Sequence, residues 1–128
     1  MDILHVSTGM STVFGPGLES PLSPPKDFKY SWLVYGGSQI KKSVKVPVIA
    51  VGGIRTPQQA GCLVENNISD FAALGKGLLV DAEWANKARQ QVEVLTCLDC
   101  KVCAYFRRGA ATGEDCPREK EKAKSRPA

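Results

Sequence analysis

Three short apolar runs alternate with helical patterns as far as about residue 95. The runs cover residues 3–6, 46–51 and 68–74, and each is followed by small or turn-forming residues. Short runs of this kind predict strands, and the unbroken run at 46–51 predicts a strand that is buried on both faces. The chain therefore has three candidate strands, separated by segments long enough to hold helices.

Helical spacing predicts the first connection. Over residues 31–44, Leu33, Ile40 and Val44 fall on one face at three- to four-residue steps when Gly37 fills the gap. We expect a helix there, although two adjacent glycines weaken its interior.

A capping pattern predicts the second helix. Thr56 can cap a helix that has Pro57 at its first position, and Gln59 stands three residues after the cap. This helix is expected to run to about Asn66. The side chains expected to face inward are Ala60, Leu63 and Val64.

Two further helical segments complete the pattern. A short helical turn is expected over residues 75–80, and a last helix is expected from Asp81 to about Leu95. Residues 10–30 contain several glycines and prolines and are expected to form a long irregular loop. Alternating strands and helices require a parallel sheet with right-handed crossovers, so the predicted fold class is α/β.

Charge is concentrated at the end of the chain. The 128 residues have a formal net charge of +4, and residues 118–126 carry five cations and two anions. A mixed-sign end without aromatic residues predicts a solvated, disordered tail over residues 118–128. No basic face with interleaved aromatics occurs elsewhere, which argues against nucleic-acid binding. No apolar run is long enough to predict a membrane span.

The cysteines bear on both location and chemistry. Because the chain begins in a strand-like pattern and lacks the features of a secretory signal, a cytoplasmic location is expected. In a reducing compartment the five cysteines are read as metal ligands or free thiols, not as disulfides. Cys62, among apolar neighbours on the second helix, is expected to be a small buried residue.

Two glycine turns predict a phosphate site. Gly52 and Gly53 follow the second strand, while Gly75 and Lys76 follow the third. Backbone N–H groups at two such turns can hold a phosphate, and a lysine adds positive charge. Phosphate sites of this kind follow strands seven and eight of (β/α)8 barrels. The alternative is that the glycines only make tight turns.

Three segments carry a resemblance to a known family. DILHVSTG at 2–9, VPVIAVGGI at 46–54 and SDFAALGKGLLVDAEW at 69–84 resemble the C-terminal part of the old yellow enzyme family of NADH:flavin oxidoreductases. The resemblance covers about residues 2–95. It implies the last three βα units of an FMN-binding (β/α)8 barrel, which needs about 250 residues when complete.

The resemblance also implies roles for particular residues. Gly52, Gly53, Gly75 and Lys76 would hold the FMN phosphate, with Lys76 standing where the family usually has arginine. The family's first five strands supply most contacts to the flavin ring and the usual proton donor, so no catalytic residue is assigned here. His5 is expected to be packed or hydrogen-bonded and not catalytic.

Four cysteines form a metal-binding pattern after the last helix. Cys97, Cys100, Cys103 and Cys116 have the spacing C-x2-C-x2-C-x12-C, which suits an iron–sulfur cluster. Zinc prefers paired CxxC motifs or Cys/His mixtures. A subset of the family that includes 2,4-dienoyl-CoA reductase and trimethylamine dehydrogenase carries a [4Fe-4S] cluster at this position, with closely similar spacing. Zinc, or no metal, stays open as an alternative.

The expected organisation follows from these patterns. Residues 1–95 would form part of an FMN-binding barrel, residues 96–117 a cysteine-rich iron–sulfur segment, and residues 118–128 a tail. The parent reaction implied by the resemblance is hydride transfer from FMN to an activated C=C bond. We expect the chain to be inactive alone and to need the missing N-terminal barrel portion or a homo-oligomer. A partner subunit of a split flavoenzyme and a non-flavin phosphate-binding barrel protein are the alternatives.

Overall fold

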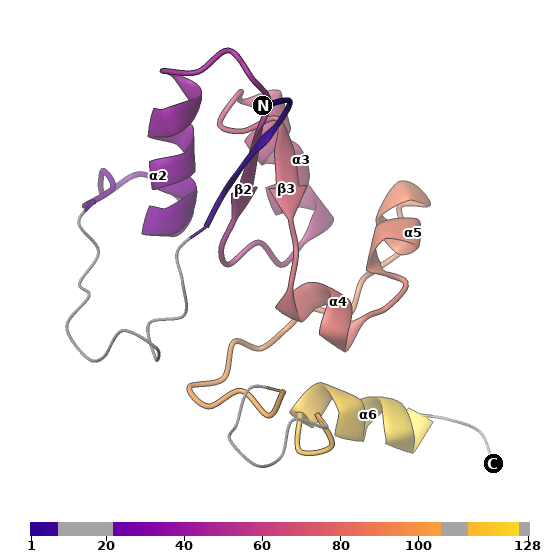
Figure 1. The fold of residues 1–128 in the computed structure, drawn as a ribbon. Coiled ribbons are helices and arrows are strands. Elements are labelled where there is room, and N and C mark those ends of the chain that lie inside the picture. Colours follow the sequence, from indigo (N-terminus) through magenta and orange to yellow (C-terminus); the bar gives the residue numbers. More distant parts are fainter. Residues whose placement is uncertain (8–21, 106–112, 126–128) are drawn as a thin grey trace. The chain divides into compact units, whose positions relative to one another are not determined.

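The computed structural model describes residues 1–7, 22–105 and 113–125 (Figure 1). Most of the predicted loop at 10–30, much of the polar stretch before Cys116 and the end of the tail lie outside these residues. The chain forms two compact units, Met1–Leu74 and Gly75–Ala128, and each is described by itself. The expected boundaries at residues 95 and 117 stay predictions, because a division into packed units does not test where a family domain ends.

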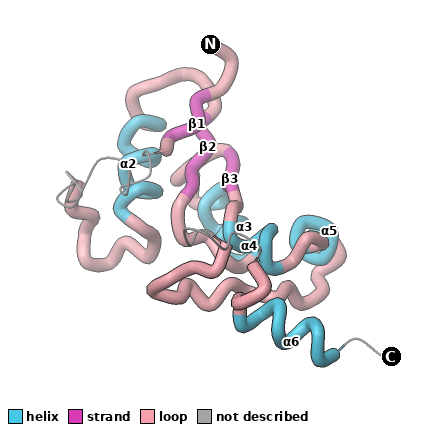
Figure 2. The backbone as a smooth tube through the Cα atoms, turned by 60° about the horizontal axis from the view of Figure 1, so that its bottom comes forward, coloured by secondary structure: helices cyan, strands magenta, loops and turns pink. Residues whose placement is uncertain are grey.

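The first unit contains a three-stranded parallel sheet. Its strands are β1 (Leu4–Val6), β2 (Val48–Val51) and β3 (Phe71–Ala73), in the order β1-β2-β3. Figure 2 shows the three side by side. The three predicted strands and their parallel arrangement are confirmed, and the chain has an α/β fold.

The strands are shorter than predicted because side chains and proline interrupt the ladder at their starts. Pro47 has no N–H to donate, so β2 begins after it. The N–H of Val48 donates to the Asp70 carboxylate at 2.8 Å, which takes the place of a backbone partner just before β3. The buried Ser69 hydroxyl donates to the carbonyl of Phe71 at 2.6 Å.

Helix α2 (Trp32–Lys41) packs on the sheet through small residues. A Cβ built on Gly37 would lie 3.7 Å from the Ala50 Cβ and 3.8 Å from the Val6 Cβ, so the helix backbone approaches the strands closely. Val34, on the same side, is fully buried. The helix predicted within residues 31–44 is confirmed. On the face predicted from its spacing Gly37 lies against the sheet, whereas Leu33 and Val44 are half-buried and Ile40 is 37% exposed.

Helix α3 (Pro57–Glu65) begins as the capping pattern predicts. The Thr56 side chain accepts from the N–H of Gln59, and the Gln59 side chain accepts in return from the N–H of Thr56. Leu63 is fully buried, as expected. Val64 is 48% exposed and Cys62 is exposed, so both were wrongly predicted to be buried.

The core of the first unit lies on one side of the sheet. Val34, Ala50, Ile54 and Leu63 form it, with Phe28 and other partly buried side chains packed around them. The prediction that the second strand is buried on both faces was wrong. Along β2 fully buried and half-buried residues alternate, because the described helices of the first unit cover only one face.

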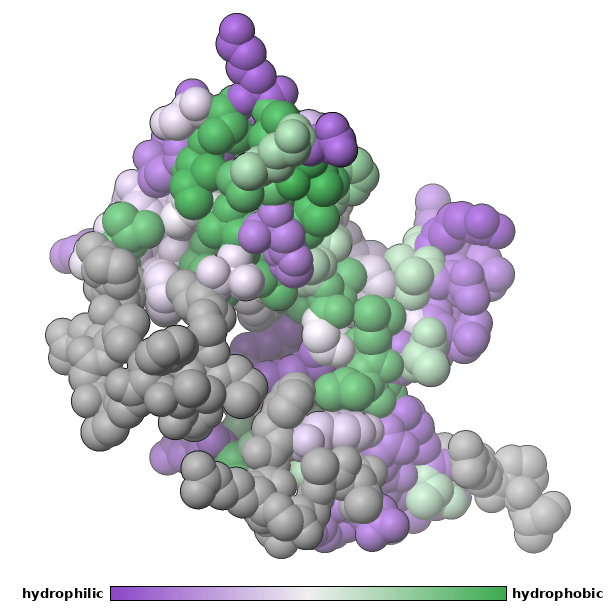
Figure 3. Space-filling model, viewed as in Figure 1, coloured by the Kyte–Doolittle hydropathy of each residue, from purple (hydrophilic) through white to green (hydrophobic). Residues whose placement is uncertain are grey.

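The other face of this sheet is apolar and partly open. His5, Ile49 and Phe71 occupy one row across the three strands. Phe71 is 52% exposed and Ile49 is half-buried. His5 is exposed, so the expectation of a packed histidine was wrong. Figure 3 shows apolar side chains gathered on the side of the first unit that faces the viewer.

The second unit begins with two short helices, α4 (Lys76–Val80) and α5 (Trp84–Arg89). The predicted helical turn over 75–80 is confirmed. The helix predicted to reach Leu95 ends at Arg89, because Gln91 takes a left-handed φ of 57° and the N–H of Val92 turns back to the carbonyl of Lys87.

A buried carboxylate holds this segment together. Asp81, which is 5% exposed, accepts from the N–H of Leu95 at 2.9 Å and from the Lys87 ammonium group at 2.8 Å. It also accepts from the N–H of Glu83 at 3.2 Å. Burial raises the pKa of Asp81, but these hydrogen bonds and the Lys87 charge outweigh it and lower the pKa below its usual value.

Helix α6 (Pro117–Ser125) occupies most of the segment that was predicted to be a disordered tail. Its mixed charges stand at helical spacing. Arg118 pairs with Glu121 and Glu119 pairs with Lys122, each at 2.7 Å and three residues apart. Ion pairs between surface residues three apart stabilise the helix that carries them. Among the described residues, no helix is long and apolar enough to cross a membrane.

Candidate functional site

The glycine turn after β2 is built on two left-handed residues. Gly52 has a φ of 130° and Gly53 a φ of 72°. A Cβ on Gly52 would lie 2.7 Å from the Ser31 hydroxyl oxygen, whereas a Cβ on Gly53 would meet nothing within 4 Å. At Gly52 the left-handed φ and the close contact with Ser31 both require glycine. Gly53 leaves open space beside the turn.

The second glycine turn follows β3. Gly75 precedes α4, and its carbonyl accepts from the N–H of Leu78 at 3.0 Å. A Cβ on Gly75 would meet nothing within 4 Å. Lys76 is the first residue of α4. Both turns therefore come directly after strands that are neighbours and parallel, with Val51 opposite Ala73.

The two glycine turns belong to different units. Gly52 and Gly53 lie in the first, while Gly75 and Lys76 lie in the second. That the four residues hold one phosphate therefore stays a prediction.

Within the second unit, Lys76 has a partner that the sequence did not indicate. Its ammonium nitrogen lies 2.8 Å from a carboxylate oxygen of Asp99. The hydrogen bond to Asp99 is the main cause that raises the pKa of Lys76; burial opposes it, and the thiols of Cys97 and Cys103 add smaller contributions. No helical or strand spacing relates residues 76 and 99, so no sequence signal pointed to this pair.

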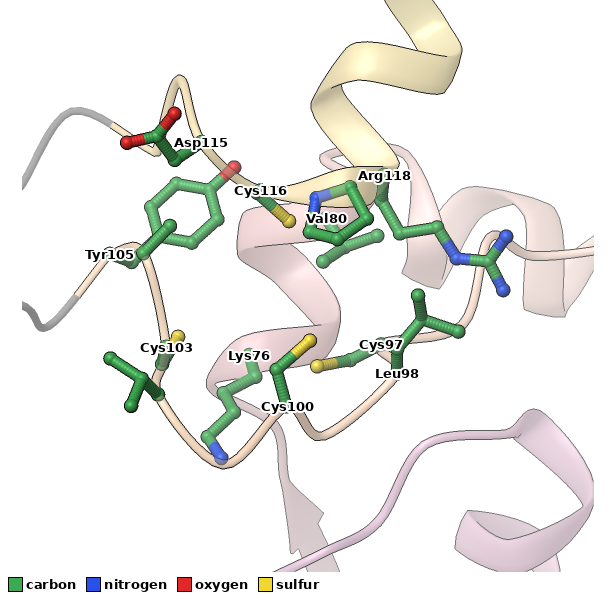
Figure 4. A pocket seen from close by; sticks show the side chains of 13 residues that line it. Lys76, Val80, Cys97, Leu98, Cys100, Cys103, Tyr105, Asp115, Cys116 and Arg118 are labelled. Atoms are coloured by element: carbon green, nitrogen blue, oxygen red, sulfur yellow. The ribbon is translucent and has the colours of Figure 1, made fainter.

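The four predicted metal ligands line one cavity of the second unit. Cys97, Cys100, Cys103 and Cys116 surround about 40 Å³ of space, together with other side chains that include Lys76. We call this the cysteine pocket (Figure 4). Figure 4 shows the sulfurs of Cys97 and Cys100 directed toward one another and that of Cys116 directed into the same space. Within the part of the chain that the structure describes, no three His, Cys, Asp or Glu side chains already stand as a ligand set.

The first CxxC turn brings a backbone donor to a cysteine sulfur. Asp99 takes a left-handed φ of 53°, and its N–H donates to the Cys97 sulfur at 3.4 Å. A metal-bound sulfur can accept the same hydrogen bond, so the turn is compatible with Cys97 as a ligand.

Cys116 stands at the start of α6. Its carbonyl accepts from the N–H of Lys120 at 3.1 Å, and its own N–H donates to the carbonyl of Gly113 at 2.8 Å. The first turn of α6 therefore fixes the backbone of this fourth cysteine.

Tyr105 links two helices of the second unit. Its hydroxyl donates to the Glu119 carboxylate at 2.8 Å and lies 3.1 Å from the carbonyl of Leu79, so it links α6 to α4. Any side chain on Gly113, whose φ is 71°, would run into the Tyr105 ring. Burial and the bond to Glu119 raise the pKa of Tyr105 to about 12. No sequence signal pointed to this residue, since a single tyrosine carries no pattern.

Arg118 links the start of α6 to the residue before Cys97. Its Nε donates to the carbonyl of Thr96 at 3.0 Å, next to Cys97, while a terminal nitrogen pairs with Glu121. The residue had been assigned to the disordered tail. In the structure it fastens the start of α6 to the segment that enters the cysteine pocket.

Comparison with known proteins identifies the family. The parallel βα units place the chain in the α/β class. A model of the NADH:flavin oxidoreductase / NADH oxidase family matches residues 24–94. The chain belongs to this family, which is a flavin-dependent oxidoreductase family related to old yellow enzyme.

Several relatives have enzymatic names. A protein of Thermoanaerobacter brockii named NADH oxidase is 39% identical over 102 residues, which cover 78% of this chain and 15% of the relative. NADH:acrylate oxidoreductase of Vibrio harveyi is 35% identical over 106 residues, 83% of this chain and 9% of the relative. Bilirubin reductase of Mediterraneibacter gnavus is 39% identical over 64 residues, 48% of this chain and 10% of the relative. The chain thus spans a small part of each.

Proposed function

We propose that this chain is part of an FMN-dependent oxidoreductase and carries the FMN-phosphate site of that enzyme. Bound FMN would supply hydride chemistry, while this chain's contribution is to hold the phosphate at Gly52, Gly53, Gly75 and Lys76. The main support is the pair of adjacent parallel strands, β2 and β3, each followed by a glycine turn with open space at Gly53 or Gly75. The match of residues 24–94 to a flavin-dependent oxidoreductase family supports a flavin-binding role.

The three βα units would be the last three of a (β/α)8 barrel. The half-open sheet face that bears Phe71 and Ile49 supports this, because a barrel buries that face against other strands. The remaining strands would come from another part of the protein or from a partner chain. The acceptor would be an activated C=C bond or a related group, and we expect no such reduction by these 128 residues alone.

The phosphate site can be tested by ligand discrimination. The purified chain is titrated with FMN and with riboflavin, which lacks the phosphate, and flavin fluorescence is followed. FMN is expected to bind at least tenfold more tightly than riboflavin. The Lys76→Glu variant should lose most of this preference, whereas Lys42→Glu, which reverses another lysine's charge at the end of α2, should keep it. Equal affinities for the two flavins would contradict the proposed site.

We also propose that the cysteine pocket holds a [4Fe-4S] cluster, whose chemistry is the relay of single electrons. Four thiols and no histidine around one cavity suit iron–sulfur ligation. The N–H bond to Cys97 and the helix start at Cys116 fix the backbone at two of the four positions. Zinc in the same pocket is the alternative.

Anaerobic reconstitution distinguishes the two metals. With iron and sulfide, the chain should take up about four of each per molecule and develop a broad visible absorption. Cys100→Ser should abolish this uptake, and Cys62→Ser, which removes an exposed thiol of the first unit, should not. A colourless protein that instead retains one zinc per chain would refute the cluster.

A further inference from the structure

Lys76 reaches the segment that bears the cysteines. Its ammonium group pairs with Asp99, which stands between Cys97 and Cys100 in the sequence. The two side chains are 43% and 45% exposed, so the pair is half-open to solvent. Figure 4 shows the Lys76 side chain running from the start of α4 toward the loop that carries Cys100 and Cys103.

The same lysine lines the cysteine pocket. It borders the cavity together with all four thiols. Lys76 therefore contacts the Asp99 carboxylate and also borders the cysteines that would hold a metal.

The chemistry of a loaded pocket makes this placement significant. Metal binding to thiols releases their protons, so loading the pocket adds negative charge. A divalent ion with four thiolate ligands carries two excess negative charges, and a cluster of core charge 2+ with four thiolates carries the same excess. A nearby cation stabilises such a centre, and a nearby carboxylate destabilises it. Lys76 and Asp99 therefore act on it in opposite directions.

We propose that Lys76 and Asp99 set the charge balance of the cysteine pocket, with Lys76 favouring the metal-loaded state and Asp99 opposing it. Both are positioning residues that act through the thiols and not as ligands. The inference rests on the proposed metal-binding role of the four cysteines and adds to it a residue that had been assigned to phosphate binding alone.

Binding of Co²⁺ by the full chain tests the proposal. Thiolate ligation of Co²⁺ gives a near-ultraviolet charge-transfer absorption, which is followed at fixed pH and low ionic strength. Lys76→Met should weaken Co²⁺ binding about threefold, and Asp99→Asn should strengthen it by a similar factor. Asparagine is the matched replacement at Asp99, because it tolerates the left-handed φ of this position and keeps the N–H that bonds Cys97.

Control variants distinguish the local electrostatic effect of Lys76 and Asp99 from effects of net charge and of folding. Lys45→Met removes the same charge from an exposed lysine of the first unit and should leave Co²⁺ affinity unchanged. Lys76→Arg keeps a cation and should restore affinity close to that of the unchanged protein. Raising the salt concentration should shrink the effects of Lys76→Met and Asp99→Asn together.

The possible outcomes are distinguishable. If the unchanged protein binds Co²⁺ and Cys100→Ser does not, the cysteine site exists. Equal affinities for all variants would then overturn the charge-balance proposal alone. Weakening by both Lys76→Met and Asp99→Asn would also overturn it, because the pair would then only shape the loop. Absence of thiolate absorption in the unchanged protein would overturn the cysteine site and this proposal with it.

Discussion

The hydroxyl of Ser31 donates to the carbonyl of Gly52 at 3.0 Å, and its oxygen accepts from the N–H of Val34 at 3.4 Å. One side chain therefore caps α2 and fastens the glycine turn after β2. This turn belongs to the proposed phosphate site, so the stability of a helix and the shape of a binding loop depend on the same oxygen.

Ser31→Ala should lower the free energy of unfolding by about 1 kcal/mol, because it removes a helix cap and leaves the Gly52 carbonyl without this donor. Urea unfolding followed by circular dichroism measures the change. The same variant should weaken FMN binding without affecting riboflavin. Ser43→Ala, at an exposed serine just beyond α2, is the matched control and should change neither quantity.

Gly52 and Gly61 should respond oppositely to the same substitution. Gly52→Ala places a Cβ 2.7 Å from the Ser31 oxygen at a φ of 130°, and we expect it to cost about 1–3 kcal/mol of stability. Gly61 lies in α3, where a Cβ would meet only the Glu65 carboxylate at 3.7 Å, so Gly61→Ala should stabilise by about 0.5–1 kcal/mol. Thermal unfolding of both variants would show the contrast. Equal losses of stability in Gly52→Ala and Gly61→Ala would contradict the strain expected specifically at Gly52.

Local chemistry explains which parts of the fold could be predicted. The start of α3 was predictable because Thr56, Pro57 and Gln59 act within a few residues of one another. The full burial of Val34 in α2 was not, because it follows from the close approach of the helix to the sheet at Gly37, which no local pattern sets. The end of α5 likewise depends on a left-handed residue, Gln91, that carries no glycine signal.

The candidate site divides in the same way. The cysteine spacing identified four side chains that the structure brings to one pocket, since three of them are only three residues apart. The contacts that surround them are long-range. Lys76 bonds to Asp99, and Tyr105 bonds to Glu119. Loops separate the partners in each pair, so no helical or strand period in the sequence predicts these contacts.

Asp81 predicts a loss of stability in acid. Its pKa is lowered in the folded state, so the stabilisation is complete above its ordinary value of about 3.8 and is lost as pH falls through the lower folded value. Asp81→Asn should remove this dependence and cost about 1–3 kcal/mol at neutral pH, because Lys87 loses its partner and a buried acceptor is altered. Urea unfolding at a series of acidic pH values tests it. The loss of stability in acid should persist in Asp115→Asn, which removes an exposed carboxylate. If it disappears in Asp115→Asn, Asp81 is not its cause.

Tyr105 makes the corresponding prediction in alkali. Its pKa is raised from 10.0 to about 12, so the stabilisation is complete below pH 10 and is lost as pH rises toward 12. Burial also raises the pKa of Tyr30, so ultraviolet titration should find more than one tyrosine that ionises above pH 10. The phase near pH 12 should vanish in Tyr105→Phe. Because the hydroxyl ties α4 to α6, Tyr105→Phe should also raise the rate at which a thiol reagent modifies Cys103 and Cys116. Tyr35→Phe, in the first unit, is the control and should leave the modification rate unchanged. An unchanged rate in Tyr105→Phe, or an equally raised rate in Tyr35→Phe, would show that the Tyr105 hydroxyl does not protect Cys103 and Cys116.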